Sequence, residues 1–419
     1  MSRFPFDAPV TVHPFTARRD GDEAVVGDAR HQTFLAIPVD ALDLLEWLAA
    51  GVTLGEAVRR YEERHGDTPE VEPFLDTLAG EGFVAPAGGA PAPPQPPSPP
   101  PPGRVWNLDR LSPATARRLL GVPVLAGCGA LVVVAVVLAA GEPTVLPGPS
   151  SLAFETNFSA YLWTVMAIAA VGLFGHELAH VVGARAAGVQ ARIRVGNQMY
   201  AIVVQTEMSG IWLVPRRQRY LALLAGMIVD LTGAAVLVIL LWLDRVGLVG
   251  YPEPVRIVLS AVLFTHFIRL LWQTFVFLRT DLYYVAVTAL GTRSLMADTD
   301  AYLRNVVRRV LRRRLVDTSG VGPREMRAVR LFSVVWLAGR ILALVVLVTA
   351  TVPLLVYYAG RVLSLVRGEP VTGTFTWVDV LSIAAFVFVV EGGGVVMWVR
   401  SLLRARRARR QAPDRVLVE

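Results

Sequence analysis

The sequence predicts a mainly helical, polytopic membrane protein that carries a small α+β domain at its N-terminus. Three observations predict this class. The chain has 419 residues, 54% hydrophobic and only 18% charged, which is too apolar for a soluble protein of this length. Six apolar segments are long enough to cross a bilayer, and the basic residues gather in alternate loops between them.

Residues 1–86 form the predicted small domain, because short apolar strands and amphipathic helices follow one another there. The expected elements are strands at 23–26 and 33–37, helices at 38–50, 53–65 and 69–79, and extended chain again at 82–84. Thr53 followed three residues later by Glu56 is typical of a capping box. Three helices with a β-ribbon indicate a winged-helix-like domain.

Residues 87–118 form the expected linker and juxtamembrane segment. Nine of the twelve residues from Pro91 to Pro102 are proline. Such a stretch adopts polyproline II, at about 3.1 Å per residue, and separates domains as a semi-rigid spacer. A spacer is favoured over a ligand for an SH3-type domain.

The membrane domain is expected over residues 119–399. Its six spans cover 119–140, 159–183, 220–243, 256–278, 331–356 and 376–399. All basic residues are arginine, and the loops on one side carry 28 of them against 4 on the other. The positive-inside rule therefore predicts that both termini are cytoplasmic. The basic tail, 400–419, is expected to contact membrane lipids through their headgroups.

The second span ends in His176-Glu177-Leu178-Ala179-His180. Positions i and i+4 share one face of a helix, so His176 and His180 can offer two imidazoles to one metal ion. Glu177 is then placed to act as general base toward water on that metal. Chance HExxH motifs usually lie on polar helices, but ionisable residues within a span are costly and usually functional.

A third ligand is expected at Asp281. Spans two and four both run from outside to inside, and a helix needs about 20 residues to cross, so Asp281 lies at the depth of His180. Catalytic zinc takes three protein ligands and keeps one open position. The sole cysteine, Cys128, excludes a thiolate site. We therefore expect Zn²⁺ at His176, His180 and Asp281.

Other polar groups lie within the apolar runs. Asp230 and Arg269 could form an interhelical pair, and His266 is favoured as a core histidine over a ligand. Glu391 has no assigned role. Residues 191–206 are predicted to form a hairpin that turns at Gly196-Asn197 and lies beside the HELAH motif.

The membrane part resembles the site-2-protease-like intramembrane zinc metalloproteases, in particular the branch of peptide zinc metalloproteases. The matching stretches are 176–180 (HELAH), 212–219 (WLVPRRQR), 225–226 with Asp230, 279–284 (RTDLYY) and 297–304 (ADTDAYLR). The resemblance implies that His176, His180 and Asp281 bind zinc and that Glu177 activates water. Many relatives have an Asn/Pro-containing stretch before the aspartate, where this chain has Gln273-Thr274-Phe275-Val276.

The N-terminal domain resembles the PqqD-like peptide-recognition element of pathways for ribosomally made, modified peptides. The matching stretches are 28–38, 44–48 (LLEWL), 51–57 (GVTLGEA) and 74–84. The resemblance implies that a leader peptide adds to the ribbon as a strand. The expected peptide-binding residues are Thr33, Phe34, Leu35, Phe74 and Leu78. A DNA-binding winged helix is disfavoured, because residues 69–84 hold four acidic and no basic residues.

Together these features predict a zinc metallopeptidase of the bacterial inner membrane that hydrolyses a precursor peptide captured by its N-terminal domain. A peptide-modifying enzyme or a transporter is a further expected partner, and nucleic acid is not. Two alternatives stay open. One is a regulated intramembrane protease that cuts a membrane-anchored regulator. The other is a non-catalytic partner in peptide maturation, export or immunity.

Overall fold

The computed structural model divides the chain into two compact units. The first comprises residues 1–105 with the short segments 187–191 and 207–215, and the second comprises the rest. The structure describes residues 3–20, 23–28, 33–85, 106–107, 110–198, 201–292, 295–316, 322–371 and 373–388, with 393, 396, 399, 400 and 403. The Pro-rich stretch, Glu391 and most of the basic tail lie outside these residues.

The first unit packs three helices against two small antiparallel sheets. Its elements are β1 Thr11–Val12, β2 Thr16–Asp20, β3 Glu23–Asp28, β4 Thr33–Pro38, α1 Val39–Ala49, α2 Leu54–His65, α3 Val71–Gly80, β5 Val84–Ala85 and the 3-10 turn η3 Ser209–Leu213. The strands pair in the orders β2-β3-β4 and β1-β5. A small strand-containing region was expected here. Strands β1 and β2 were not among the predicted elements.

The core of this unit comes from the apolar face of each helix. Leu45, Leu75 and Leu78 are fully buried in one cluster. The capping box predicted at Thr53 does not form. Thr53 occupies the N-cap position without a side-chain hydrogen bond, because Glu56 turns instead to Arg59 and Arg60 on the helix surface.

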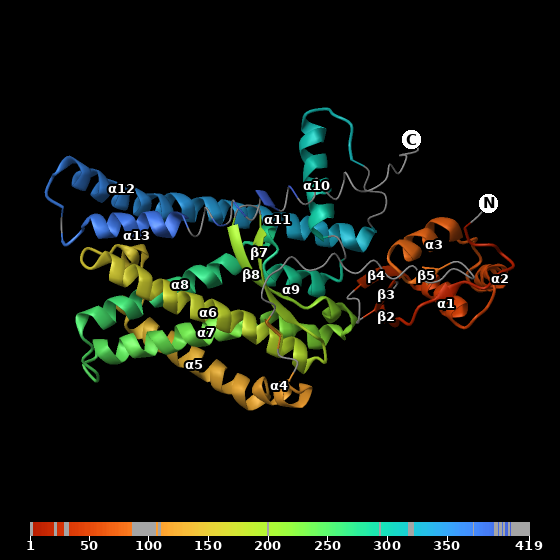
Figure 1. Cartoon of the computed structure of the whole chain (residues 1–419), viewed down its shortest axis with the longest axis horizontal. Coiled ribbons are helices and arrows are strands. Elements are labelled where there is room, and N and C mark those ends of the chain that lie inside the picture. The colour runs from red at the N-terminus through yellow and green to blue at the C-terminus, as the bar shows by residue number, and fades with distance from the viewer. Residues whose placement is uncertain are drawn as a thin grey trace. The chain divides into compact units, whose positions relative to one another are not determined.

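The second unit is mainly helical (Figure 1). Its elements are β6 Trp106–Asn107, α4 Pro113–Leu119, α5 Val122–Gly141, η1 Pro143–Val145, η2 Pro149–Leu152, α6 Phe158–Ala186, β7 Arg192–Gln198, β8 Ala201–Glu207, α7 Arg216–Arg245, α8 Glu253–Gln273, η4 Val276–Leu278, α9 Asp281–Leu290, α10 Leu295–Val310, α11 Pro323–Val346, the π turn η5 Leu347–Thr351, α12 Val352–Arg367 and α13 Trp377–Val387.

Five helical stretches among the described residues are long and apolar enough to cross a membrane: 113–141, 158–186, 216–245, 253–273 and 325–367. Many of their apolar side chains face outward, such as Val133 on α5 and Val334 on α11, which are 62% and 65% exposed. Lipid is the solvent that suits such surfaces. The prediction of a mainly helical membrane protein is therefore confirmed.

Some predicted boundaries were wrong. The segment around 331–356 belongs to a continuous helical stretch that runs to Arg367; Gly360 within it does not interrupt the helix, which ends before the left-handed Gly368. The fourth span ends at Gln273 instead of residue 278. A sixth span at 376–399 stays a prediction, since the continuous described helix there is α13, of 11 residues.

Helix α7 is the centre of the membrane unit, with α5, α6 and α8 packed around it (Figure 1). Small residues permit the closest approach. A Cβ at Gly183 of α6 would lie 2.7 Å from the Cα of Ala222 on α7. Glycine at such a crossing lets two helix backbones touch within a bilayer, which brings the HELAH segment directly against α7.

The predicted hairpin is present as β7 and β8, which form a sheet in the order β6-β7-β8. The predicted turn at Gly196-Asn197 is wrong, because β7 continues through both residues to Gln198. The two-residue β6 pairs with the start of β7 through Trp106 and Ile193. The segment that follows the Pro-rich linker is thereby fixed to the hairpin.

Candidate metal centre

Two histidines and an aspartate meet near the C-terminal part of α6, where the sequence predicted a metal site. His176 and His180 lie on α6 and Asp281 begins α9, and their ligand atoms all lie within 4.8 Å of one another. The imidazole Nε2 atoms are 3.1 Å apart. The Asp281 Oδ2 lies 3.1 Å from the first Nε2 and 3.2 Å from the second.

Each imidazole is oriented through its other ring nitrogen. The Nδ1 of His176 lies 2.8 Å from Asp230 Oδ2, and the Nδ1 of His180 lies 2.8 Å from the carbonyl oxygen of Ala222. Both partners are acceptors, so each Nδ1 carries the proton and donates it. In the neutral form of each imidazole the lone pair is therefore on Nε2, and both Nε2 atoms face Asp281.

The floor of the site is one face of α7. Ala222, Gly226 and Asp230 recur at spacings of four residues and so share a helix face. A Cβ at Gly226 would lie 2.5 Å from the Nε2 atoms of both histidines. Only a residue without a side chain fits beneath the imidazoles, so Gly226 creates the space in front of their lone pairs.

A buried ion pair supports the first histidine. Arg269 of α8 donates from Nη2 to Asp230 Oδ1 at 2.7 Å, and Asp230 is 1% exposed. Arg269 also reaches the carbonyl of Ala169 on α6. The interhelical pair that the sequence suggested is present, and it continues to His176. A carboxylate behind a ligating histidine fixes its ring orientation and raises its basicity.

Asp281 is held by the residue at which α8 ends. Gln273 donates from Nε2 to Asp281 Oδ2 at 2.8 Å, and its Oε1 accepts from the Asp281 backbone N–H at 3.0 Å. Thr280 Oγ1 donates to the Gln273 carbonyl. These bonds close the turn between α8 and α9, which explains why the span ends five residues early.

The remaining polar groups of α9 stay neutral. Burial raises the pKa of the Tyr283 and Tyr284 hydroxyls. Asp281 is the one acidic residue that α9 brings to the site.

Glu177 is held by the hairpin. Thr206, near the end of β8, lies 2.8 Å from Glu177 Oε2 and 2.9 Å from the Glu177 carbonyl oxygen, and both oxygens accept from its single hydroxyl proton. Glu177 is 7% exposed. The sequence placed the hairpin beside the motif but did not identify Thr206 as its point of contact.

These donors fit a divalent metal ion. The two Nε2 atoms and Asp281 Oδ2 lie 3.1–3.2 Å from one another, so the cluster needs a positive charge among these atoms, either a proton on an imidazole or a metal ion. Two imidazole nitrogens and one carboxylate form a donor set that zinc uses in catalytic sites. Arg269 offsets the charge of Asp230, so a divalent ion would balance the charges of Asp281 and Glu177.

The other predicted residues lie as follows. His266 is outside the cluster, with Nδ1 3.0 Å from the Val262 carbonyl oxygen and Nε2 facing Gly233. Leu35 and Phe74 are half-buried against the N-terminal core. Leu78 is fully buried in that core, so its place on a peptide-binding surface is corrected. The side chains of Thr33 and Phe34 are not described.

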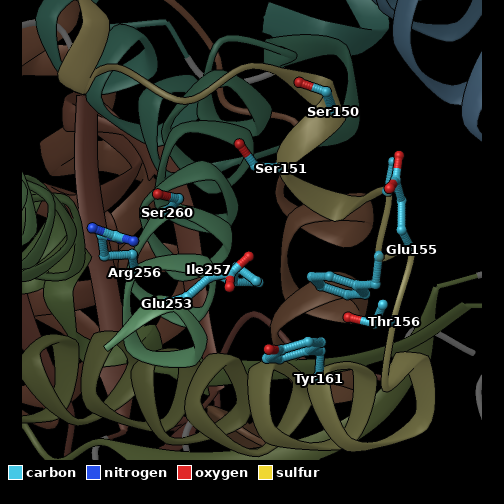
Figure 2. Close-up of a pocket in the computed structure, with 11 residues that line it drawn as sticks. Ser150, Ser151, Glu155, Thr156, Tyr161, Glu253, Arg256, Ile257 and Ser260 are labelled. Atoms are coloured by element: carbon cyan, nitrogen blue, oxygen red, sulfur yellow. The ribbon is translucent and has the colours of Figure 1, made fainter. Parts of the chain in front are cut away.

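A separate cavity of about 530 Å³, with mixed polar and apolar lining, lies near the opposite ends of α6 and α8 (Figure 2). Tyr161, Glu155, Glu253 and Arg256 are among its lining residues. Tyr161 precedes His176 by 15 residues on α6, which corresponds to about 22 Å along a helix. This cavity is therefore not part of the histidine–aspartate site.

The chain gives no match in comparisons with protein-family models, with curated proteins or with solved structures. The geometry of the site is thus the basis for assigning a function.

Proposed function

We propose that this protein is a membrane-embedded zinc metallopeptidase that hydrolyses a precursor peptide captured by its N-terminal domain. One observation carries the proposal. Three acceptor atoms, the Nε2 of His176 and His180 and the Oδ2 of Asp281, converge with both Nδ1 atoms already engaged. Beside them is a carboxylate, Glu177, on the same helix.

His176, His180 and Asp281 would hold the zinc ion, in agreement with the resemblance of the motif to intramembrane metalloproteases. When bound, zinc supplies Lewis acidity toward a carbonyl oxygen and toward water. The support around the ligands is extensive, because Asp230, Ala222 and Gln273 each fix one of them. Such preorganisation is what a catalytic metal site requires.

Glu177 would act as general base and then as general acid. Its carboxylate takes a proton from the attacking water while oxygen bonds to the scissile carbonyl carbon. The C–N bond then breaks, and Glu177 returns the proton to the leaving nitrogen. The products are one new carboxylate and one new amine. Thr206 keeps the Glu177 carboxylate in place through a hydroxyl hydrogen bond.

Strand β8 would align the substrate. Among the described residues, β8 is an edge strand of the β6-β7-β8 sheet. Its Thr206 contacts Glu177. A peptide added beside β8 would be extended, with its carbonyls exposed for attack. The strand edge and the catalytic carboxylate thereby support a peptide as substrate over a compact small molecule.

The N-terminal domain would capture the leader part of the precursor. Its β4 is an edge of the β2-β3-β4 sheet in the described chain, and Leu35 and Phe74 are half-buried against the core. Within the same unit η3 packs against β2 and β3, and the Arg18 Nη1 donates to the Val214 carbonyl. The inner membrane of a bacterium, with both termini cytoplasmic, is the proposed location.

The replacement Glu177→Gln tests this function in the full chain reconstituted in nanodiscs with a library of quenched fluorescent peptides. We expect zinc content to stay at the wild-type level and cleavage to fall by about 10²–10⁴-fold, the usual contribution of a general base. Cleavage that survives in the zinc-loaded variant would show that Glu177 is not the base. Absence of cleavage by the wild type would favour a non-catalytic partner.

A further inference from the structure

A surface that is both basic and apolar lies on α10 and the turn that follows it, apart from the metal centre. Along α10, Leu303, Val306, Val307 and Val310 recur at spacings of three and four and so form one stripe. Val307 and Val310 are 56% and 80% exposed. An apolar stripe this exposed indicates contact with something other than water.

Arginines flank this stripe on both sides. Taking 100° per residue, Arg304 and Arg308 fall on one side of it and Arg309 on the other. Arg304 is paired with Asp300. Within the described residues, Arg308, Arg309, Arg312, Arg313 and Arg314 have no acidic partner. Five guanidinium groups in seven residues repel one another unless an anion lies nearby.

The turn after α10 keeps these arginines together. Asn305 accepts from the Val316 N–H at 2.7 Å and donates to the Val316 carbonyl at 2.9 Å, so residues 311–316 fold back onto the helix. Arg312 has a φ of 49°, in the left-handed region where glycine is usual after a helix.

The location of α10 matches a membrane surface. Figure 1 shows α10 lying across the direction of the spanning helices, and it packs against α11. Helix α11 begins at Pro323, seven residues after Val316, and enters the spanning stretch that starts at Glu325. A helix in this place can lie in the plane of the interface, with its apolar stripe in the acyl region and its arginines at the headgroups.

We propose that residues 303–316 form an interfacial site that binds anionic phospholipid headgroups. The apolar stripe favours a bilayer over an acidic peptide or a nucleic acid, neither of which offers an apolar layer of the required depth. The unpaired arginines favour anionic over zwitterionic lipid, because each arginine near such a surface adds to the attraction. This site is independent of the proposed peptidase activity.

Spin labelling of the full chain in nanodiscs tests the site. The only native cysteine is replaced by Cys128→Ala, and a nitroxide is attached at Val310→Cys. Ala297→Cys is the matched control, because Ala297 is exposed on α10 in line with Arg304 and Arg308 at spacings of seven and four. Accessibility to oxygen and to a water-soluble nickel complex is measured in phosphatidylcholine alone and with added phosphatidylglycerol.

With phosphatidylglycerol present we expect the ratio of oxygen to nickel accessibility to be several-fold higher at position 310 than at position 297. Replacing Arg308, Arg309, Arg312 and Arg313 by glutamine should remove the dependence on phosphatidylglycerol. Equal water accessibility at both positions would overturn the proposal. Protection of position 310 that needs an added acidic peptide or RNA instead of anionic lipid would overturn it as well.

Discussion

At the scale of single residues, the site depends on which nitrogen of each histidine is free. The acceptors on α7 bind both Nδ1 atoms and leave both Nε2 atoms facing Asp281. The ligand histidines follow from the sequence, because i and i+4 spacing requires only a helix. Their orientation does not, because it depends on Asp230 and Ala222, which are 54 and 42 positions away in the chain from the histidines they contact.

Asp230→Asn should weaken zinc binding by about 10–100-fold, because His176 loses its anionic support and Arg269 is left unpaired. Competition with a chromophoric chelator measures the affinity in the full chain. Asp244→Asn, on the same helix and bonded to the Tyr251 N–H, is the control. An equal effect of the two changes, or none, would contradict a positioning role. Adding Arg269→Gln to Asp230→Asn should recover part of the affinity, since the unpaired charge is removed.

Gly226→Ala should abolish stoichiometric zinc binding. The new methyl group would lie 2.5 Å from both ligating nitrogens, well inside van der Waals contact, so the imidazoles must move. Gly175→Ala is a stringent control, because position 175 precedes His176 but has no atom within 4 Å of a Cβ. Zinc content by mass spectrometry should separate the two variants, and equal content would show that the space above Gly226 is not needed.

At the scale of elements, the sequence predicted most helices but not how their ends are arranged. Counting residues along spans two and four placed Asp281 at the depth of His180. The turn that delivers Asp281 was not predictable, because it depends on Gln273 bonding to a residue eight positions later. The four-residue spacing of Ala222, Gly226 and Asp230 shows that these residues share one face of α7. The sequence does not show that α6 packs against this face, so their role in the site could not be predicted.

Thr206→Val should lower kcat about tenfold or more with zinc content unchanged. The loss corresponds to a hydrogen bond to a charged group, about 1.5–3 kcal/mol, and it leaves the Glu177 carboxylate less well oriented. Steady-state cleavage of a fluorescent peptide is the measurement. Gln205→Ala, at the exposed neighbouring position of β8, should keep wild-type kcat. A change in zinc affinity instead of kcat would place Thr206 in support of the metal ligands.

At the scale of the whole molecule, the chain combines a small domain of strands and helices with a membrane unit. The unit boundary falls between residues 105 and 106, inside the segment that the sequence marked as linker and juxtamembrane. The composition of the sequence separates these parts, because the N-terminal domain, the proline-rich stretch and the apolar spans differ sharply. The inclusion of residues 207–215 in the first unit could not be predicted, since it depends on packing between segments about 190 residues apart.

Deletion of residues 1–103 should raise the KM for an intact precursor by about 10–100-fold, because tethering no longer concentrates the peptide near the site. The kcat should change little, since the metal centre lies entirely in the membrane unit. A short peptide containing only the cleavage site is the matched substrate, and its KM should be unaffected. An unchanged KM for the intact precursor would show that the N-terminal domain does not capture it.

The central claim is that three side chains bind one zinc ion in the membrane unit. Zinc K-edge absorption spectroscopy on the full chain in nanodiscs tests it most directly. The account predicts one zinc per chain with two imidazole ligands at about 2.0–2.1 Å, oxygen in the other positions and no sulfur, and loss of this signature in His180→Ala. Sub-stoichiometric zinc, or a spectrum without imidazole scattering, would contradict the account.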